Sequence, residues 1–249
     1  MSARRRHGGR NALLLVAALF ALWQAMYWAV GDSALSSPLA TLRYTANLVT
    51  GEDFRMHLFD TMRAFAIAFA LSVVIGLLVG FWLGFDRLSG DALEPMIVTV
   101  YAIPKLTLYP ILLLAFGLGL SAKVAFGVLH GTIPIILFTL GAVRNTKPIL
   151  LKTGHVLKLS RPQMVRWILF PAAIPEIFTG LRVGFSLTLI GSLLAEMFAS
   201  QRGLGYLLMN GIGLHNIELV MSVTLLIVVF AAAVSTLLLQ IDRRLHRQG

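Results

Sequence analysis

The stretch AFAIAFALSVVIGLLVGFWLGF, residues 64–85, contains no charged side chain. An apolar run of about 18 residues or more is long enough for a helix to cross a lipid bilayer. A second run of this kind, NALLLVAALFALWQAMYWAV, occupies residues 11–30. Across the chain, 57% of residues are hydrophobic and only 13% are charged, which is about half the charged share of an ordinary soluble domain. The composition therefore indicates an integral membrane protein.

Six apolar segments are each long enough to span a hydrocarbon core about 30 Å thick. They cover roughly residues 11–30, 60–85, 93–117, 123–143, 174–199 and 217–240. The first follows a basic N-terminus like that of a signal peptide, but it is longer than a signal-peptide core and no convincing cleavage site follows it, so we expect it to be retained. The predicted fold class is all-α, a polytopic membrane bundle of about six transmembrane helices that forms a single domain over residues 1–249.

The net charge of +10 is divided unequally between the segments that join these spans. The positive-inside rule assigns the more basic set of segments to the cytoplasm. That set holds Arg4, Arg5, Arg6, Arg10, Arg87, Arg144, Lys147, Lys152, Lys158, Arg161, Arg166, Arg243, Arg244 and Arg247, and the external set holds Arg43, Arg55, Lys123 and Arg202. We therefore expect a cytoplasmic tail at 1–10, an external loop at 31–57, a cytoplasmic segment at 144–172 and both termini inside. Because the basic residues form no continuous face, nucleic-acid binding is not expected.

Two local patterns bear on how the spans pack. In the third span, Pro104 and Pro110 flank Lys105, and proline removes a helix hydrogen bond, so we expect a break that is buried in protein or lines a cavity. Glycines recur at four-residue spacing in the second and fifth spans, at positions 76, 80, 84, 180 and 184. Such spacing lets helices approach closely, either within one chain or between subunits.

The cytoplasmic segment 144–172 carries six Lys or Arg residues and no acidic residue. It is longer than a simple connection requires. We expect one short helix capped by Thr146 with Pro148 in its first turn, and a second that begins near Ser160 and stops before Pro171. Two short helices at the membrane surface would form a docking platform for a cytoplasmic partner.

This segment resembles the EAA loop of ABC importer permeases, whose pattern is E-A-A, three residues, G, nine residues and I-x-L-P. The matching positions are Lys152-Thr153-Gly154, Lys158 and Ile168-Leu169-Phe170-Pro171. Together with AIPKLTLYPILLLAFGLG and SQRGLGYLL, the chain is similar over residues 57–245 to the nitrate, sulfonate and taurine type of permease.

The resemblance implies a type I importer permease fold and a multi-pass protein of the bacterial inner membrane. It implies that the loop docks on a separate cytoplasmic ATPase through Lys152, Thr153, Gly154, Leu157, Lys158, Ser160, Arg161, Ile168, Phe170 and Pro171. It also implies an external solute-binding protein and a homodimer or heterodimer of permeases. Lys152 replaces the family's Glu and Lys158 its Gly, which suggests either an unusually acidic ATPase groove or a merely solvated basic loop.

Charged residues within the spans are the candidates for the translocation pathway. They are Lys105, Arg182 and Glu196. Intramembrane charges usually face a bundle interior or a watery cavity. Arg182 and Glu196 share a helix face but lie about 21 Å apart along the axis, so they cannot touch. Arg182 would favour an anionic group and Glu196 would help to gate or select. Alternatively, each pairs with a neighbouring helix or extends to the nearer interface.

The chain shows no motif for catalysis. It has no G-x-x-x-x-G-K-[ST] phosphate loop, no HExxH and no G-x-S-x-G, so we expect no catalytic residue, cofactor or metal ion, and place any ATP hydrolysis on another subunit. The predicted role is the transmembrane subunit of an ATP-driven importer of a sulfonate-, taurine- or nitrate-like solute. A thiamine-precursor or pyrimidine-like solute remains open. A secondary transporter would usually show internal repeats, and none is visible; a membrane enzyme would need a cluster of histidine or acidic ligands at one interface, which is also missing.

Overall fold

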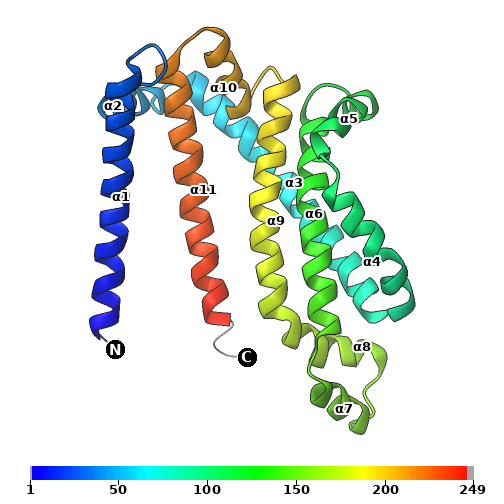
Figure 1. Ribbon diagram of the computed structural model, residues 1–249. Helices are drawn as coiled ribbons and strands as arrows, with labels where there is room; N and C mark the ends of the chain where they lie inside the picture. Colours follow the sequence, from blue (N-terminus) through cyan, green and yellow to red (C-terminus); the bar gives the residue numbers. More distant parts are fainter. Residues whose placement is uncertain (1, 246–249) are drawn as a thin grey trace.

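The computed structural model describes residues 2–245, and every regular element within them is helical. In chain order the elements are α1 (Ser2–Val30), α2 (Pro38–Leu48), α3 (Glu52–Phe85), α4 (Arg87–Ala102), η1 (Lys105–Leu108), α5 (Tyr109–Phe116), α6 (Leu120–Arg144), α7 (Pro148–Val156), α8 (Arg161–Met164), η2 (Val165–Leu169), α9 (Phe170–Ala199), α10 (Leu204–Gly213) and α11 (Ile217–Leu245). The short helices α2, α5 and α10 lie at one end of the long helices, and α7 and α8 lie at the other (Figure 1). The predicted all-α fold is confirmed.

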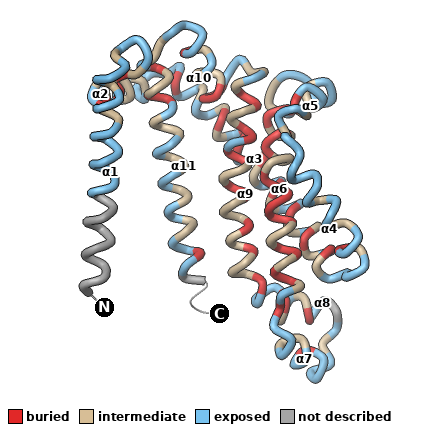
Figure 2. The backbone as a smooth tube through the Cα atoms, in the orientation of Figure 1, coloured by how far each residue is buried: buried red, intermediate tan, exposed pale blue. Residues whose placement is uncertain are grey.

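Helix α6 forms the centre of the bundle, because α3 and α9 both pack along it. Buried positions concentrate on α6 and on the sides of α3 and α9 that face it (Figure 2). The described side chains of α1 are mostly exposed and those of α11 are mostly exposed or half-buried in this single chain, as expected of surfaces that meet lipid or another subunit. The described part of α1 is joined to the next segment by a hydrogen bond that Trp23 Nε1 donates to the Ser36 carbonyl, at 3.0 Å.

Glycines allow this close contact with α6. A methyl group at any of the five predicted packing positions would overlap an α6 side chain: Ile135 for Gly76 and Gly184, Thr139 for Gly80, Val143 for Gly84 and Phe138 for Gly180. The four-residue spacing places these glycines on one stripe of each helix, which is the arrangement that brings membrane helices together. Of the two interpretations left open by the sequence, packing within one chain is confirmed.

The number of membrane crossings differs somewhat from the six expected. Within the described residues, four helices are long and apolar enough to cross a bilayer: Glu52–Phe85, Leu120–Arg144, Pro162–Ala199 and Ile217–Arg243. Helices α4 and η1–α5 give a fifth span if they are taken together, although the chain bends by 89° between them. The predicted span at 11–30 falls in α1, whose described apolar part, Leu14–Val30, is shorter than these.

The break in the third span occurs where the prolines predict it. Helix α4 ends at Ala102, Pro104 is extended, and Lys105 begins a single 3₁₀ turn. Pro110 then lies in the first turn of α5, where its missing N–H removes no intrahelical bond. The bend therefore separates two helices rather than distorting one.

The predicted end of the second short helix in segment 144–172 is wrong. The second short helix does not stop before Pro171, because α8, η2 and α9 run on as one helix over Pro162–Ala199. Residues Val165–Leu169 form a π turn in which the Phe170 N–H donates to the Val165 carbonyl, five residues earlier. The wider turn accommodates the ring of Pro171, which has no N–H to donate, without ending the helix.

Candidate functional sites: the cytoplasmic loop, the outer cluster and the Arg182 pocket

The segment 144–172, expected to be cytoplasmic, folds against the C-terminal end of α6. Gly154 of α7 is buried, and a methyl group there would overlap the side chain of Met164 in α8. Met164, Val143 and Leu169 form a buried cluster that Leu151, Val165 and Ile168 extend. The pair of short helices is therefore anchored to the bundle by its own apolar side chains.

The outward side of this pair is both apolar and basic. Val156 is 81% exposed, and Leu157, Ile149 and Trp167 are each more than 60% exposed. The exposed residues among those predicted for the loop are Lys152, Thr153, Leu157, Lys158, Ser160, Phe170 and Pro171. Of the remaining predicted loop residues, Gly154 is buried and Ile168 is half-buried; Arg161 begins α8, and its side chain lies outside the described part.

The backbone at Lys158 explains why the related loop pattern has a glycine there. Lys158 has a positive φ of 49°, its N–H donates to the His155 carbonyl at 2.9 Å, and the next N–H, of Leu159, donates to the Gly154 carbonyl at 3.0 Å. This pair of bonds is the Schellman motif that ends a helix, and its left-handed residue is usually glycine. Lys158 thus occupies a strained position in a turn that is otherwise normal for the family pattern.

The expected cap of α7 is wrong. Lys147, not Thr146, precedes the first helical residue, Pro148, and no side chain caps the helix. Thr146 is buried instead, and its Oγ1 donates to the Ala142 carbonyl at 3.2 Å. The hydroxyl is therefore used to finish α6 rather than to begin α7.

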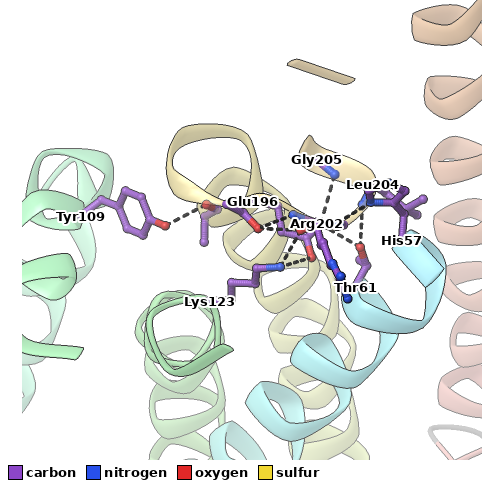
Figure 3. A network of polar contacts seen from close by, with 11 residues as sticks. His57, Thr61, Tyr109, Lys123, Glu196, Arg202, Leu204 and Gly205 are labelled. Atoms are coloured by element: carbon purple, nitrogen blue, oxygen red, sulfur yellow. Dashed lines mark hydrogen bonds and ion pairs between the residues drawn. The ribbon is translucent and has the colours of Figure 1, made fainter. Parts of the chain in front are cut away.

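At the end of the bundle where α2, α5 and α10 lie, Glu196 lies in a closed polar cluster (Figure 3), here named the outer cluster because this end is expected to face outward. Its side chain has no exposed surface. Thr61 Oγ1 donates to Glu196 Oε2 at 2.7 Å, the Gly205 N–H donates to the same oxygen at 3.1 Å, and Lys123 Nζ lies 3.4 Å from Oε1. Lys123 also donates to the Arg202 carbonyl, at 2.6 Å. Three long helices, α3, α6 and α9, meet at this carboxylate.

The segment between α9 and α10 closes over Glu196. Gly203 has a φ of +119°, and any side chain at this position would overlap the Glu196 carboxylate. The Gly203 N–H donates to His57 Nδ1 at 3.0 Å, and the Leu204 N–H donates to Thr61 Oγ1 at 2.8 Å. Backbone amides of this segment thus bind side chains of α3, while its glycines make room for the carboxylate.

This environment favours one of the two interpretations of Glu196. A residue that lines an open path needs accessible surface, and Glu196 has none in this chain. It pairs with a neighbouring helix through Lys123, the alternative that the sequence left open. A buried carboxylate needs hydrogen bonds and an opposite charge, and Thr61, Gly205 and Lys123 supply them to Glu196.

Arg182 lies in a different environment, beside a cavity of about 310 Å³ between α4, α9 and α11. Tyr101, Ser186 and Ser235 also line it. An Arg182 terminal nitrogen lies 3.9 Å from Asp242 Oδ2, whereas its Nε is buried and has no hydrogen-bond partner. Arg182 thus brings a guanidinium group to the cavity lining, with a loose ion pair to Asp242.

Lys105 approaches the same region from the break in the third span. Its Nζ donates to the Tyr101 carbonyl at 3.0 Å and lies 4.6 Å from the centre of the Tyr101 ring. Tyr101 thus contacts Lys105 and lines the same cavity as Arg182, which links two of the three predicted pathway residues. Glu196 lies elsewhere, in the outer cluster.

The partners of these charges were not identified from the sequence. The charge pattern places Lys123 on the external side and indicates no role for Thr61 or Asp242. A rule that intramembrane charges pair with opposite charges would have suggested an acid for Arg182 and a base for Glu196. Choosing among the candidates required the helix packing, because the paired residues lie on different helices.

Comparison with known proteins agrees with this architecture. Residues 72–248 match the family described as "Binding-protein-dependent transport system inner membrane component". The chain belongs to this family. One relative is SsuC of Bacillus subtilis (strain 168), a permease protein named for aliphatic sulfonates transport. The chain is 25% identical to it over 209 residues, and the match covers 83% of this chain and 76% of SsuC.

Other members of the family bear different names. The chain is 28% identical over 204 residues to the formylaminopyrimidine transport permease protein ThiX of Halalkalibacterium halodurans, and the match covers 82% of this chain and 81% of ThiX. Its fold resembles a chain in an inward-facing structure of the MetNI methionine ABC transporter, with a TM-score of 0.67 and 18% identity over 76% of this chain and 94% of that one. The fold is that of an ABC importer permease, as the resemblance of the loop implied.

Proposed function

We propose that this chain is the transmembrane subunit of an ATP-driven importer for a small anionic solute, with ATP hydrolysis on a separate subunit. Two permease chains, identical or closely related, form the pathway in a bacterial inner membrane, with both termini in the cytoplasm. Two ATPase subunits dock on residues 146–171, and an external binding protein delivers the solute to the opposite end. The family membership supports the general role. The exposed face of the loop supports the ATPase-docking role, and the cavity at Arg182 supports an anionic solute.

The observation that carries the proposal is the apolar and basic face of α7 and α8. Val156 and Leu157 project from a segment whose inner side is anchored on Met164 and Leu169. Exposed apolar side chains on an anchored element are typical of a protein interface. Since Lys152 and Lys158 are exposed beside them, the docked partner should present an apolar groove with acidic residues at its edge.

The helix that follows this face supplies a mechanical connection to the pathway. Because Pro162–Ala199 is one helix, a displacement of α8 moves α9, which carries Arg182. In an alternating-access cycle, ATP would close the ATPase pair and bias the permease toward one of two states. Such a bias requires that the ATPase contact the two states differently.

An anionic solute is the best match to the cavity at Arg182. The cavity is lined by the Arg182 guanidinium group and two serine hydroxyls, and Lys105 contacts Tyr101, another lining residue. Arginine binds carboxylate and other oxyanions through paired hydrogen bonds. The aliphatic sulfonates in the name of SsuC belong to this class, whereas the formylaminopyrimidine in the name of ThiX does not carry such a charge.

Co-purification in detergent tests the ATPase-docking role. Tagged full-length chain is co-expressed with the ABC ATPase encoded next to it, as wild type and as Val156→Asp and Leu88→Asp. Both residues are 81% exposed and both lie in segments assigned to the cytoplasm, so the two substitutions cost the fold equally little. We expect Val156→Asp to lose ATPase capture by at least about tenfold and Leu88→Asp to retain it.

A second pair of variants tests the charge of the loop. Lys152→Glu should weaken capture, and Arg87→Glu, which makes the same change of charge outside the loop, should not. Equal capture by Val156→Asp and Leu88→Asp would show that the ATPase docks elsewhere. Failure of the wild-type chain to capture any ATPase would contradict the proposed function.

A further inference from the structure

At the outer end of the bundle lies a second cavity, of about 470 Å³, that the proposed transport role does not use. It is formed where three segments meet: the outer part of α3, the turn between α5 and α6, and the turn between α9 and α10. Asp60, Arg63, Lys123 and Arg202 bring ionisable groups to its lining, and Ser200 and Gln201 add polar groups. The cavity is therefore polar and on the side assigned to the exterior.

The cations of this cavity are not equally available. Lys123 is committed, because its ammonium lies 3.4 Å from Glu196 and donates to the Arg202 carbonyl. Arg63 and Arg202 are exposed, and in the part of the chain that the structure describes neither guanidinium group forms an ion pair or a hydrogen bond. With Asp60 as the acid in the lining and Lys123 balanced by Glu196, the cavity retains one net positive charge.

The walls of the cavity are held in place by the outer cluster. Ser200 Oγ donates to the Arg202 carbonyl at 2.6 Å and accepts from the Arg202 N–H at 3.1 Å, so this turn is closed on itself. Lys123 then ties the turn to α6 through the same carbonyl. Gly119 and Leu120, at the start of α6, form another wall. No side chain caps α6 there, and the helix dipole adds a partial positive charge. A site with fixed walls loses little entropy when it binds a ligand.

We propose that this outer cavity binds an oxyanion, with the guanidinium groups of Arg63 and Arg202 as its donors. The ligand class is a carboxylate, sulfonate or similar planar or tetrahedral anion, which suits paired arginine hydrogen bonds. The inference rests on the proposed function, because that function places this end outside the cell. The anion can come from the free solute at the entrance or from a carboxylate side chain of the docked binding protein; the chemistry of recognition is the same.

Asp60 allows a test in which anion affinity should change in the direction opposite to the change caused by removing the arginines. Its carboxylate lines the same cavity and forms no salt bridge with Arg63 among the described residues, so it opposes an incoming anion. Removing its charge with Asp60→Asn should strengthen anion binding, and removing the cations with Arg63→Gln and Arg202→Gln should weaken it. Arg43→Gln is the matched control, because Arg43 is an exposed arginine of the same side that does not line the cavity.

The first arm of the experiment measures free anion binding to the full chain in lipid nanodiscs. Saturation-transfer NMR measures the dissociation constant of methanesulfonate from the chain. All variants carry Arg182→Gln, which removes binding at the inner cavity. We expect the double variant Arg63→Gln/Arg202→Gln to weaken binding about tenfold, Asp60→Asn to tighten it about threefold, and Arg43→Gln to leave it unchanged. Thermal unfolding of each variant verifies that the exposed substitutions leave the fold intact.

The second arm measures how much binding protein is needed to stimulate the assembled transporter's ATPase. If the anion is a carboxylate of the binding protein, the Arg182→Gln chain of the first arm, with Asp60, Arg63 and Arg202 unchanged, shows no methanesulfonate signal. In the second arm, the double variant then raises the half-maximal concentration of binding protein and Asp60→Asn lowers it. If neither readout distinguishes the variants from Arg43→Gln, the proposal is overturned even though transport and ATPase docking persist. If the wild type captures no ATPase, the proposed function fails, but the first arm still reports on the cavity.

Discussion

The Lys123 ammonium lies 3.4 Å from the Glu196 carboxylate, with side-chain exposures of 7% and 0%. The two residues are 73 positions apart and come from the start of α6 and the end of α9. Thr61 of α3 and the Gly205 amide complete the shell of the same carboxylate. One buried carboxylate thus contacts all three central helices at the same end of the bundle.

Truncation of this carboxylate should be strongly destabilising. Glu196→Ala leaves the Lys123 ammonium buried without its partner, and removal of one member of a buried pair costs about 3–5 kcal/mol. We expect a loss of that size in the free energy of unfolding, measured by SDS titration of the full chain in detergent. Glu218→Ala, at an exposed acid in the first turn of α11, should cost less than about 1 kcal/mol.

A paired substitution separates the lost charge from the lost hydrogen bonds. In a Lys123→Met background, Glu196→Gln keeps an acceptor for Thr61 and Gly205 and no longer leaves an unpaired ammonium. Its additional cost should be clearly smaller than that of Glu196→Gln alone. Additive costs would show that the two side chains do not interact energetically.

Replacement of Lys158 by glycine should stabilise the cytoplasmic loop. The left-handed conformation of a non-glycine residue costs about 1–2 kcal/mol, and Lys158→Gly removes most of that strain. Exchange of the Leu159 amide, which closes the turn, should slow by about fivefold or more in hydrogen–deuterium exchange. Lys152→Gly places glycine inside α7 and should have the opposite effect. Faster Leu159 exchange in Lys158→Gly would show that the turn is not strained.

A methyl group at Gly184 should disrupt the contact between α9 and α6. It would overlap Ile135, and the helix backbones leave little space for the two side chains to separate. We expect Gly184→Ala to cost about 1–3 kcal/mol in the unfolding assay. Gly213→Ala, where an added methyl would meet nothing within 4 Å, is the control.

The same contact can be tested by relieving the overlap. Ile135→Ala alone should destabilise the chain by opening a cavity, about 2–5 kcal/mol. Combined with Gly184→Ala, the total should be less than the sum, because the truncated side chain leaves room for the methyl group. A strictly additive double variant would place the two residues out of contact.

Removal of the Arg182 charge should lower uptake of an anionic solute without releasing the ATPase. Arg182→Gln deletes the charged donors of the inner cavity, and a hydrogen bond to a charged group contributes about 1.5–3 kcal/mol. The KM for uptake into proteoliposomes should rise by about tenfold or more, and Arg182→Lys should retain part of the affinity. Unchanged uptake with Arg182→Gln would show that Arg182 does not bind the solute and that its role is limited to the ion pair with Asp242.

The membrane character, the helical fold and the family of this chain are determined by the sequence itself. Long uncharged runs such as residues 64–85 must be helical in lipid, because no water is present to satisfy their backbone groups. The loop pattern around Gly154 and Lys158 is also local, so it could be recognised before any contact was known. The four-residue glycine spacing indicated close packing, although the identity of the partner helix, α6, was not apparent.

Only the tertiary structure decided which prolines stay within a continuous helix and which charge is paired. Pro134 and Pro175 lie inside continuous helices, whereas the chain turns by 89° beside Pro104. Glu196 and Arg182 occur on one helix face, yet one is sealed in a polar cluster and the other lines a cavity. The reason is physical: the cost of a missing backbone donor or an intramembrane charge depends on the groups that neighbouring helices bring to it, and those groups come from distant parts of the chain.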